Sequence, residues 1–336
     1  MKFLITMLLV FNTVLIFSQE PDTVPYNSYR DKWVLYSDLG FSSAPFSIKG
    51  DFSDGINRVK YRHNQKIVLG FGFAYKWLAF RLGFALPGTL RPKSRFGSPN
   101  YQDLGLQFNI KQTYWDLDIR NYSGYVIKDA NQWNDTLTAI DPNSKLPSTR
   151  SVSVSINSWY FQSKGFKMQS VLGKTGDFNQ SHGTWYVKST LNFFGSGDDF
   201  RPILPQQLVD TTINVYRGNA FSALDIGVVP GYAYVHRWNN WQASAFGGIG
   251  GVLQAKFFSA GPSSRGLLGL APRFDLRLSV GYSVPKYFVW LQSNFDVKSI
   301  RFNDLTYRQA YNTLQIVAGV RLDKKKKKVR EQIIIG

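Results

Sequence analysis

Apolar residues recur at every second position along most of this chain, and this is the period of a β-strand. In one of the clearest stretches Phe274, Leu276 and Leu278 alternate with Asp275 and Arg277. In an alternating strand one face is apolar and the other polar, so each strand must be half-buried. The pattern therefore predicts an all-β fold.

The two faces of the expected strands differ in kind as well as in polarity. One face is bulky and carries no Lys or Arg, whereas the other is rich in Gly, Ala, Ser and Asn and holds charges of both signs. Alternation fits a soluble sandwich or a membrane barrel, but a cation-free face favours the barrel, because Lys or Arg at mid-bilayer costs about 2–4 kcal/mol. We therefore predict a single antiparallel transmembrane β-barrel. The charged side chains expected to face its lumen are Arg81, Asp116, Asp118, Arg120, Lys167, Asp225, Asp275, Arg277 and Arg321.

The joints between strands fall into two groups. Tight joints are bordered by aromatic side chains, and longer polar stretches lie between them. Short periplasmic turns and longer external loops are typical of outer-membrane barrels, and amphipathic aromatic rings prefer the membrane–water boundary. The residues predicted to form such an interfacial girdle are Tyr75, Trp77, Tyr114, Trp115, Trp238, Trp241, Tyr282 and Tyr287.

The number of turns and loops indicates about twelve strands. Two regions leave the count open. Residues 32–49 could pair with each other or lengthen the first strand. The stretches 185–193 and 208–216 could form an external hairpin or two more spanning strands. With two more spanning strands, the barrel would have about fourteen strands, which is the alternative count. The expected strands lie at 53–61, 66–75, 77–86, 102–111, 114–126, 150–161, 166–173, 220–235, 241–258, 272–282, 287–299 and 312–322.

The chain starts with one Lys and a short apolar stretch that ends near Ser18, the pattern of a secretory signal peptide. We expect a signal peptide at 1–18, a periplasmic segment at 19–31, an outer-membrane barrel at 32–322 and a basic periplasmic tail at 323–336, which includes Lys324 to Lys328. The formal net charge is +18. Because export argues against nucleic acid, we expect outer-membrane lipid and lipopolysaccharide as the acidic partners. There is no Cys, so disulfides and thiol chemistry are excluded.

Three blocks of the sequence resemble a known family. Tyr61-Arg62-His63-Asn64, followed by a Gly-Phe-Gly-Phe-Ala-Tyr-Lys-Trp-Leu run at 70–78, is similar to its first block. The stretch from Trp159 to Lys167 and the stretch Gly231-Tyr232-Ala233-Tyr234 with Asn240-Trp241 resemble the second and third. The family is an uncharacterised group of Bacteroidota barrels, a domain of unknown function. The resemblance covers roughly residues 30–322 and implies an outer-membrane barrel of undetermined role, with no catalytic residues to carry over.

The sequence offers no strong catalytic or metal-binding constellation. Its histidines, His63, His182 and His236, lack the spacing of metal ligands, so we expect no metal and no other cofactor. Ser181 is followed directly by His182, and we interpret this pair as part of a solvated external loop and not as a hydrolase. The prediction is that the chain is not an enzyme.

These observations leave a passive, porin-like small pore or a structural barrel as the favoured function. Opposite charges in the lumen would hold each other in a narrow barrel, whereas a water-filled lumen would favour anions through Arg81, Lys167 and Arg321. A surface binding or adhesion module using loops 128–149 and 174–219 is the alternative, and a lipid-modifying enzyme is a weaker one. A small solute or a surface ligand is therefore a possible partner that the sequence does not identify.

Overall fold

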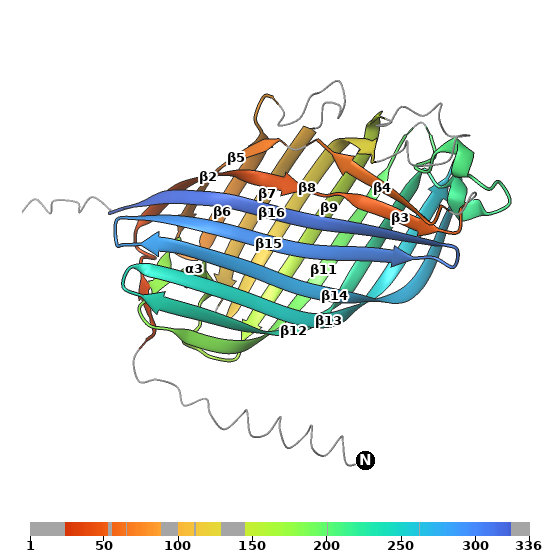
Figure 1. Ribbon diagram of the computed structural model, residues 1–336. Coiled ribbons are helices and arrows are strands. Elements are labelled where there is room, and N and C mark those ends of the chain that lie inside the picture. Colours follow the sequence, from red (N-terminus) through yellow and green to blue (C-terminus); the bar gives the residue numbers. More distant parts are fainter. Residues whose placement is uncertain are drawn as a thin grey trace, which may run out of the picture.

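Antiparallel strands form a closed ring of 12, because the last strand of the chain pairs with the first long one (Figure 1). The computed structural model describes residues 24–52, 56–64, 66–88, 100–110, 112–128, 145–199, 201–261 and 263–323. In ring order the strands are β2 (Trp33–Ser43), β5 (Ile67–Tyr75), β6 (Leu78–Ala85), β7 (Asn100–Ile110), β8 (Thr113–Ile127), β9 (Lys145–Phe161), β11 (His182–Gly197), β12 (Ala220–Trp238), β13 (Trp241–Ala260), β14 (Ser263–Ser283), β15 (Tyr287–Arg301) and β16 (Leu305–Leu322).

The predicted all-β barrel and its strand number are confirmed, but two of the predicted strands are wrong. The first ring strand is β2, within the unassigned region 32–49, whereas 53–61 contributes only the short β4 (Arg58–His63). The seventh ring strand is β11, which was only an alternative, whereas 166–173 is not a strand and contains the one-turn helix α3 (Met168–Val171). The stretches 260–271 and 300–311, which fall between the predicted strands and would therefore be loops, lie largely in β14 and β16.

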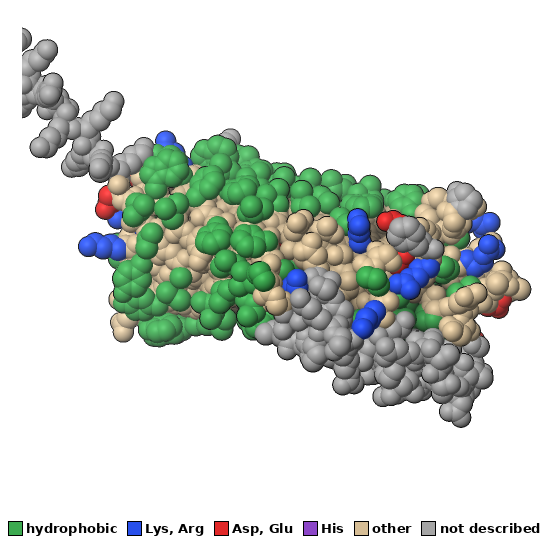
Figure 2. Space-filling view, turned by 90° about the horizontal axis from the view of Figure 1, so that it is seen from above, with side chains coloured by type: hydrophobic (Ala, Val, Ile, Leu, Met, Phe, Trp, Pro, Cys, Tyr) green, Lys and Arg blue, Asp and Glu red, His purple; other side chains and the backbone are tan. Residues whose placement is uncertain are grey.

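The outward face of the ring is an apolar belt. Leu39, Phe71, Ile226, Leu278 and Ile316 are among many large apolar side chains that point away from the lumen and are exposed. Figure 2 shows this belt along the barrel, with Lys and Arg gathered at its ends. Exposed apolar area of this extent needs a lipid environment. Among the described residues no helix is long and apolar enough to cross a membrane.

At one end of the barrel, on the left of Figure 1, four of the five connections between ring strands have two or three residues, and we call it the turn end. At the opposite end, the loop end, four of the six connections have 14 residues or more. Lys76 and Asn239 have φ of 53° and 50° in the turns that follow β5 and β12. A positive φ at this position is the conformation that two-residue hairpin turns require. β2 begins and β16 ends at the turn end, so β2 and β16 run in opposite directions along the seam that closes the ring.

Aromatic side chains surround the turn end, with one exception to the predicted girdle. Trp77, Trp238, Trp241 and Tyr287 are exposed on the outward face, and Tyr75, Trp115 and Tyr282 are partly exposed near it. Tyr114, however, is buried in the lumen, with its ring 5.5 Å from that of Trp159. The prediction for Tyr114 was wrong because Tyr114 and Trp115 are neighbours in β8, and neighbours in a strand point to opposite faces.

Near the loop end the same sheet also includes two short strands, β3 (Phe46–Gly50) and β4. β3 continues β2 after a bend and pairs with β16 on one side and with β4 on the other. β4 in turn pairs with β8. Near the loop end, the backbone pairing therefore runs from β16 through β3 and β4 to β8, and β5, β6 and β7 do not take part in it.

A second irregularity is the seam between β14 and β15. These strands pair only over 276–283 and 288–295, although β14 remains paired with β13 and β15 with β16 beyond that point. Side-chain hydrogen bonds to the carbonyl oxygens of β15 replace the missing backbone ladder there. Arg273 of β14 donates to Val297. From β13, Gln254 donates to Ser299 and Lys256 donates to Arg301. The wall is thus continuous across the seam through side chains and not through backbone pairing.

Candidate functional site in the barrel lumen

The segment 162–181 lies inside the turn end of the barrel, and we call it the turn-end plug. It joins β9 to β11 and contains α3 and β10 (Gly176–Phe178), which pairs with β1 (Tyr26–Ser28). Phe166 and Phe178 of the plug are buried against Phe161 and Phe246 of the wall. The few apolar side chains of the segment face the inward side of the wall, so their surface is buried without contact with lipid.

Polar contacts hold the plug to strands all around the ring. The ammonium of Lys174 donates to the hydroxyl of Tyr36 at 3.1 Å and to the amide oxygen of Gln107 at 3.0 Å. The guanidinium of Arg321 donates to the carbonyl of Lys174 at 2.9 Å and to that of Gly173 at 2.6 Å. These contacts come from β2, β7 and β16, so the plug cannot leave without breaking hydrogen bonds on several sides.

The segment 201–217 closes the loop end in a similar way, and we call it the loop-end plug. Ile203, Leu208 and Tyr216 are buried in a large apolar cluster with inward residues of β3, β4, β12 and β16. The hydroxyl of Tyr61 donates to the carbonyl of Ile203 at 2.8 Å, and the hydroxyl of Tyr216 donates to the carbonyl of Asp51 at 3.1 Å. Within the described residues, the lumen is therefore bounded by apolar packing at both ends.

Between the plugs lies a polar chamber of about 140 Å³. Six basic and six acidic side chains line it. The basic ones are Arg81, Arg120, Lys174, Lys188, Arg277 and Lys298, and the acidic ones are Asp38, Asp103, Asp116, Asp118, Asp275 and Asp296. The numbers of acidic and basic side chains in this lining balance, which agrees with the paired network that the sequence suggested as the alternative to a water-filled, anion-favouring lumen.

Asp275 of β14 is the centre of a network that crosses the lumen. Its carboxylate accepts hydrogen bonds from Lys188 at 3.0 Å, from the Tyr186 hydroxyl at 3.0 Å and from the Trp159 indole at 3.4 Å. Arg277 lies 3.6 Å from the same carboxylate and 3.8 Å from Asp116 on β8. The network therefore ties β14 to β8, β9 and β11, including strands that are not neighbours in the ring.

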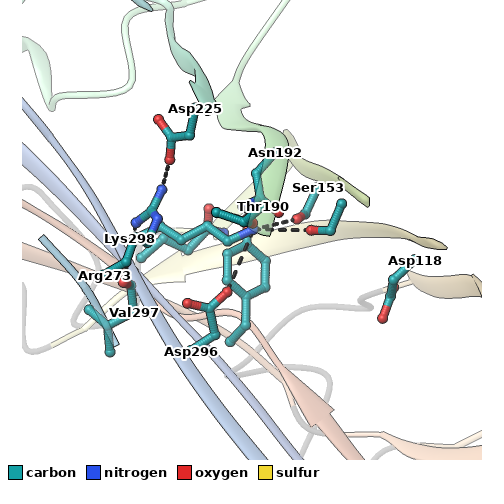
Figure 3. Close-up of polar contacts among 12 residues, drawn as sticks. Asp118, Ser153, Thr190, Asn192, Asp225, Arg273, Asp296, Val297 and Lys298 are labelled. Atoms are coloured by element: carbon teal, nitrogen blue, oxygen red, sulfur yellow. Dashed lines mark hydrogen bonds and ion pairs between the residues drawn. The ribbon is translucent and has the colours of Figure 1, made fainter. Parts of the chain in front are cut away.

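A second group of charges lies nearer the loop end (Figure 3). The ammonium of Lys298 on β15 lies 3.1 Å from the hydroxyl of Ser153 and 3.6 Å from the carboxylate of Asp296. Arg273 turns instead to Asp225 on β12, with which it forms a fully buried ion pair. Buried charges are retained in proteins when they are paired in this manner.

The structure directs nearly all the predicted lumen charges inward and pairs most of them with each other. Arg81 forms ion pairs with Asp38, at 2.6 Å, and with Asp103. Asp118 and Arg120 pair along β8, at 2.9 Å. Lys167, however, is not on a strand, because it precedes α3 in the turn-end plug; burial lowers the pKa of its ammonium, and the nearby charge of Arg30 lowers that pKa further.

Sequence reasoning missed several lumen charges: Asp38, Asp103, Lys174, Lys188, Arg273, Asp296 and Lys298. Asp103, Asp296 and Lys298 lie inside predicted strands on the face opposite the apolar side chains, so the alternation itself contained the signal. Asp38 and Lys188 were missed because their strands, β2 and β11, were left unassigned or as alternatives. Lys174 could not be found from periodicity, because it belongs to the plug.

The Ser–His pairing differs from the one that the sequence suggested. Ser181 and His182 lie at the turn end and not in an external loop. The hydroxyl of Ser181 is 3.2 Å from Nδ1 of His236, and Nε2 of His182 is 2.9 Å from the hydroxyl of Ser163. Among the hydrogen bonds of the described residues, no carboxylate contacts either imidazole, so neither pair has the orienting acid of a hydrolytic triad. Likewise, no group of metal-ligating side chains occurs in the described part of the chain.

A closed antiparallel ring, an outward apolar belt and a paired, charged interior define a transmembrane β-barrel. Within that class, the chain belongs to the family described as a domain of unknown function (DUF4421), whose model matches residues 20–322. No curated protein matches the chain in sequence.

Several solved structures are similar in fold. The translocator domain of the autotransporter NalP from Neisseria meningitidis is 8% identical with a TM-score of 0.39, and the similarity covers 87% of this chain and 88% of that one. The COG4313 outer membrane channel from Pseudomonas putida F1 is 10% identical with a TM-score of 0.36 and coverage of 90% and 98%. OmpT of Vibrio cholerae is 6% identical with a TM-score of 0.33 and coverage of 90% and 100%. At these identities the likeness concerns the fold alone.

Proposed function

We propose that this chain is a structural barrel of the bacterial outer membrane whose lumen is closed to passive diffusion. The observation that supports this most is the pair of plugs, each packed on inward side chains and joined to several strands by hydrogen bonds. Between the plugs, the balanced ion pairs contact one another instead of leaving a continuous charged path. Of the two functions that the sequence favoured, a pore and a structural barrel, this geometry favours the structural barrel.

Conductance in planar bilayers tests the proposal. The wild-type barrel should give no steady current at any applied voltage. Replacing 163–180 by a short turn, or deleting 201–217, leaves one plug in place, so each variant should remain silent. Combining both changes removes both plugs, and current in that variant alone would show that the plugs, and not the ion pairs between them, close the lumen. Heat-modifiable migration in gels serves as the folding control for every variant. Stable channels in the wild-type protein would contradict the proposal.

A surface binding function is the second candidate, but at a different place from the loops that the sequence suggested. Of the loops that were expected to display it, 129–144 lies outside the described residues, and 182–197 is a ring strand. A groove of about 780 Å³ instead opens beside the loop-end plug, with Arg201 and Arg217 in its lining. This volume lies within the range of ligand sites. The deletion of 201–217 described above removes the groove, so loss of partner or phage binding in that variant would favour this candidate.

The remaining features of the proposal concern origin, chemistry and partners. The Gly-Phe-Gly-Phe-x-Tyr-Lys-Trp-Leu motif and the end of the apolar leader at Ser18-Gln19 support an origin in Bacteroidota and export to the outer membrane. We further infer a role without catalysis, because no carboxylate among the described residues hydrogen-bonds to either imidazole of the two Ser–His pairs. Outer-membrane lipid is the partner that the apolar belt requires. The expected signal peptide and the basic tail after Asp323 lie outside the described residues.

A further inference from the structure

A cluster of cations lies on the outward face of the barrel at the loop end. Strands β3, β4, β15 and β16 meet there, and their outward positions carry exposed basic side chains on four neighbouring strands. Figure 2 shows Lys and Arg gathered at this end of the barrel, beyond the apolar belt. We call this group the basic patch; it consists of Lys49, Arg58, Lys60, Arg62, Arg301 and Arg308.

The strand register places these cations next to one another. Lys49 of β3 is directly opposite Arg58 of β4. Two residues earlier on the same face of β3, Ser47 is opposite both Lys60 of β4 and Arg308 of β16. Like charges directly opposite each other destabilise a sheet. Lys49 and Arg58 therefore repel each other in the folded barrel, and an anion bound between them would remove this repulsion.

The basic patch is not neutralised from within the described part of the molecule. None of its six side chains forms an ion pair with a described carboxylate. Four of them, Lys49, Arg58, Arg301 and Arg308, line a shallow groove of about 500 Å³, whose only described acid is Asp304. The groove also offers the hydroxyls of Ser47 and Thr306. Cations with neighbouring hydroxyl donors are the chemistry that binds phosphate groups.

The position of the patch relative to the belt identifies the source of the phosphate. On β16 the outward series runs from Ile316 and Leu314 in the belt to Arg308 in the patch. Six residues of strand span about 20 Å, which at a tilt of about 45° rises about 14 Å above Leu314, the last large apolar side chain on the outward face of β16. This height is beyond the hydrocarbon and beyond the phosphate of an ordinary phospholipid, but within reach of a larger sugar-phosphate headgroup.

We propose that the basic patch binds the phosphorylated saccharide headgroup of a glycolipid of the lipopolysaccharide type in the outer leaflet. The acyl chains of this lipid lie along the belt on β15 and β16, and its phosphates lie among Lys49, Arg58, Lys60 and Arg308. The lipid binds outside the lumen, so this interaction does not depend on whether the barrel is closed.

The test compares two charge-matched double variants of the full chain in zwitterionic detergent. Lys49→Gln with Lys60→Gln removes two cations of the patch, and Lys76→Gln with Lys286→Gln removes two exposed lysines at the turn end. Purified lipopolysaccharide is titrated against each protein by calorimetry. Near a charged lipid surface each cation contributes about 1 kcal/mol, so the patch variant should bind about 30-fold more weakly. The turn-end variant should bind like the wild type.

Further titrations establish which chemical group of the lipid the patch recognises. Dephosphorylated lipopolysaccharide should bind at least tenfold more weakly than the intact lipid, and raising the salt concentration should weaken binding of the wild type. Inorganic phosphate, or vesicles with phosphatidylglycerol, binding the wild type as tightly as lipopolysaccharide would overturn the glycolipid assignment. Equal affinity of the patch variant and the wild type would overturn the patch. Should the patch variant fail to show heat-modifiable migration, the dephosphorylation arm on the wild type decides the proposal.

Discussion

At the scale of residues, Asp275 shows how this barrel retains charge in a narrow interior. Asp275 is 6% exposed, and its carboxylate has partners on β9, β11 and β14. A buried ion is costly unless each of its lone pairs finds a donor. Tyr186, Lys188 and Trp159 supply those donors, and Arg277 adds a second cation. The network is therefore a set of cross-lumen ties, and the chamber is small because the ties fill it.

Gly173 provides a residue-scale test of the turn-end plug. It has a φ of 66°, and a Cβ added there would lie 1.9 Å from the indole nitrogen of Trp290. We expect Gly173→Ala to push the plug away from the wall and expose Lys164, Lys167 and Lys174 to trypsin, because the rigid ring and the backbone of the plug cannot both remain in place. Limited proteolysis in detergent should show cleavage in the plug at least ten times faster than in the wild type.

The control for this substitution is Gly261→Ala. Gly261 also has a positive φ, 59°, but no atom lies within 4 Å of its added Cβ. Both changes cost about 1–2 kcal/mol of backbone strain, and only the change at Gly173 meets Trp290. Equal proteolysis of the two variants would show that strain and not the contact is responsible, and would remove the support for a tightly seated plug.

At the scale of elements, the seam between β14 and β15 is the weakest part of the described wall. Its exposed residues on β14 include Leu268 and Leu270, and the latter is 86% exposed. Pro272 lies in the same unpaired stretch, as expected, since proline is confined to strand edges. Stability here depends on side chains that reach the carbonyls of β15 and not on a backbone ladder.

Gln254→Leu tests this dependence. The amide of Gln254 donates to the carbonyl of Ser299 at 3.0 Å and to the carboxylate of Asp225 at 2.8 Å. A leucine of similar size leaves both acceptors buried without this donor, which should lower the free energy of unfolding by about 1–3 kcal/mol. Urea unfolding in lipid vesicles measures the loss, and hydrogen exchange should rise selectively at 296–301. Gln102→Leu, at an exposed position of β7, should change neither quantity.

The elements also show what the sequence could predict. Alternation identified ten of the ring strands near their observed positions, because the belt forces one apolar side chain at every second residue. It failed for 166–173, where Phe166, Met168 and the neighbouring apolar residues bury their side chains inside the barrel and not against lipid. An apolar segment inside a lumen has no required period, so the plugs, and with them the closure of the site, could not be predicted from periodicity.

At the scale of the whole molecule, the asymmetry between the two ends predicts its orientation in the membrane. Both ends of the ring lie at the turn end, where four of the five connections have two or three residues, whereas four of the six connections at the loop end have 14 residues or more (Figure 1). In outer-membrane barrels, short turns face the periplasm and long loops face outward. The basic patch then faces the outer leaflet, which is the leaflet that the proposed glycolipid occupies. The binding proposal therefore depends on this orientation.

Cysteine labelling of intact cells tests this orientation. The chain has no Cys, so single substitutions give an unambiguous signal. Asn303→Cys is exposed between β15 and β16 at the loop end, and Asn240→Cys is exposed in the turn between β12 and β13. A membrane-impermeant maleimide should label only the former in intact cells and both after the outer membrane is permeabilised. Labelling of Asn240→Cys alone in intact cells would reverse the orientation, and the basic patch would then face the periplasm, where no lipopolysaccharide is present.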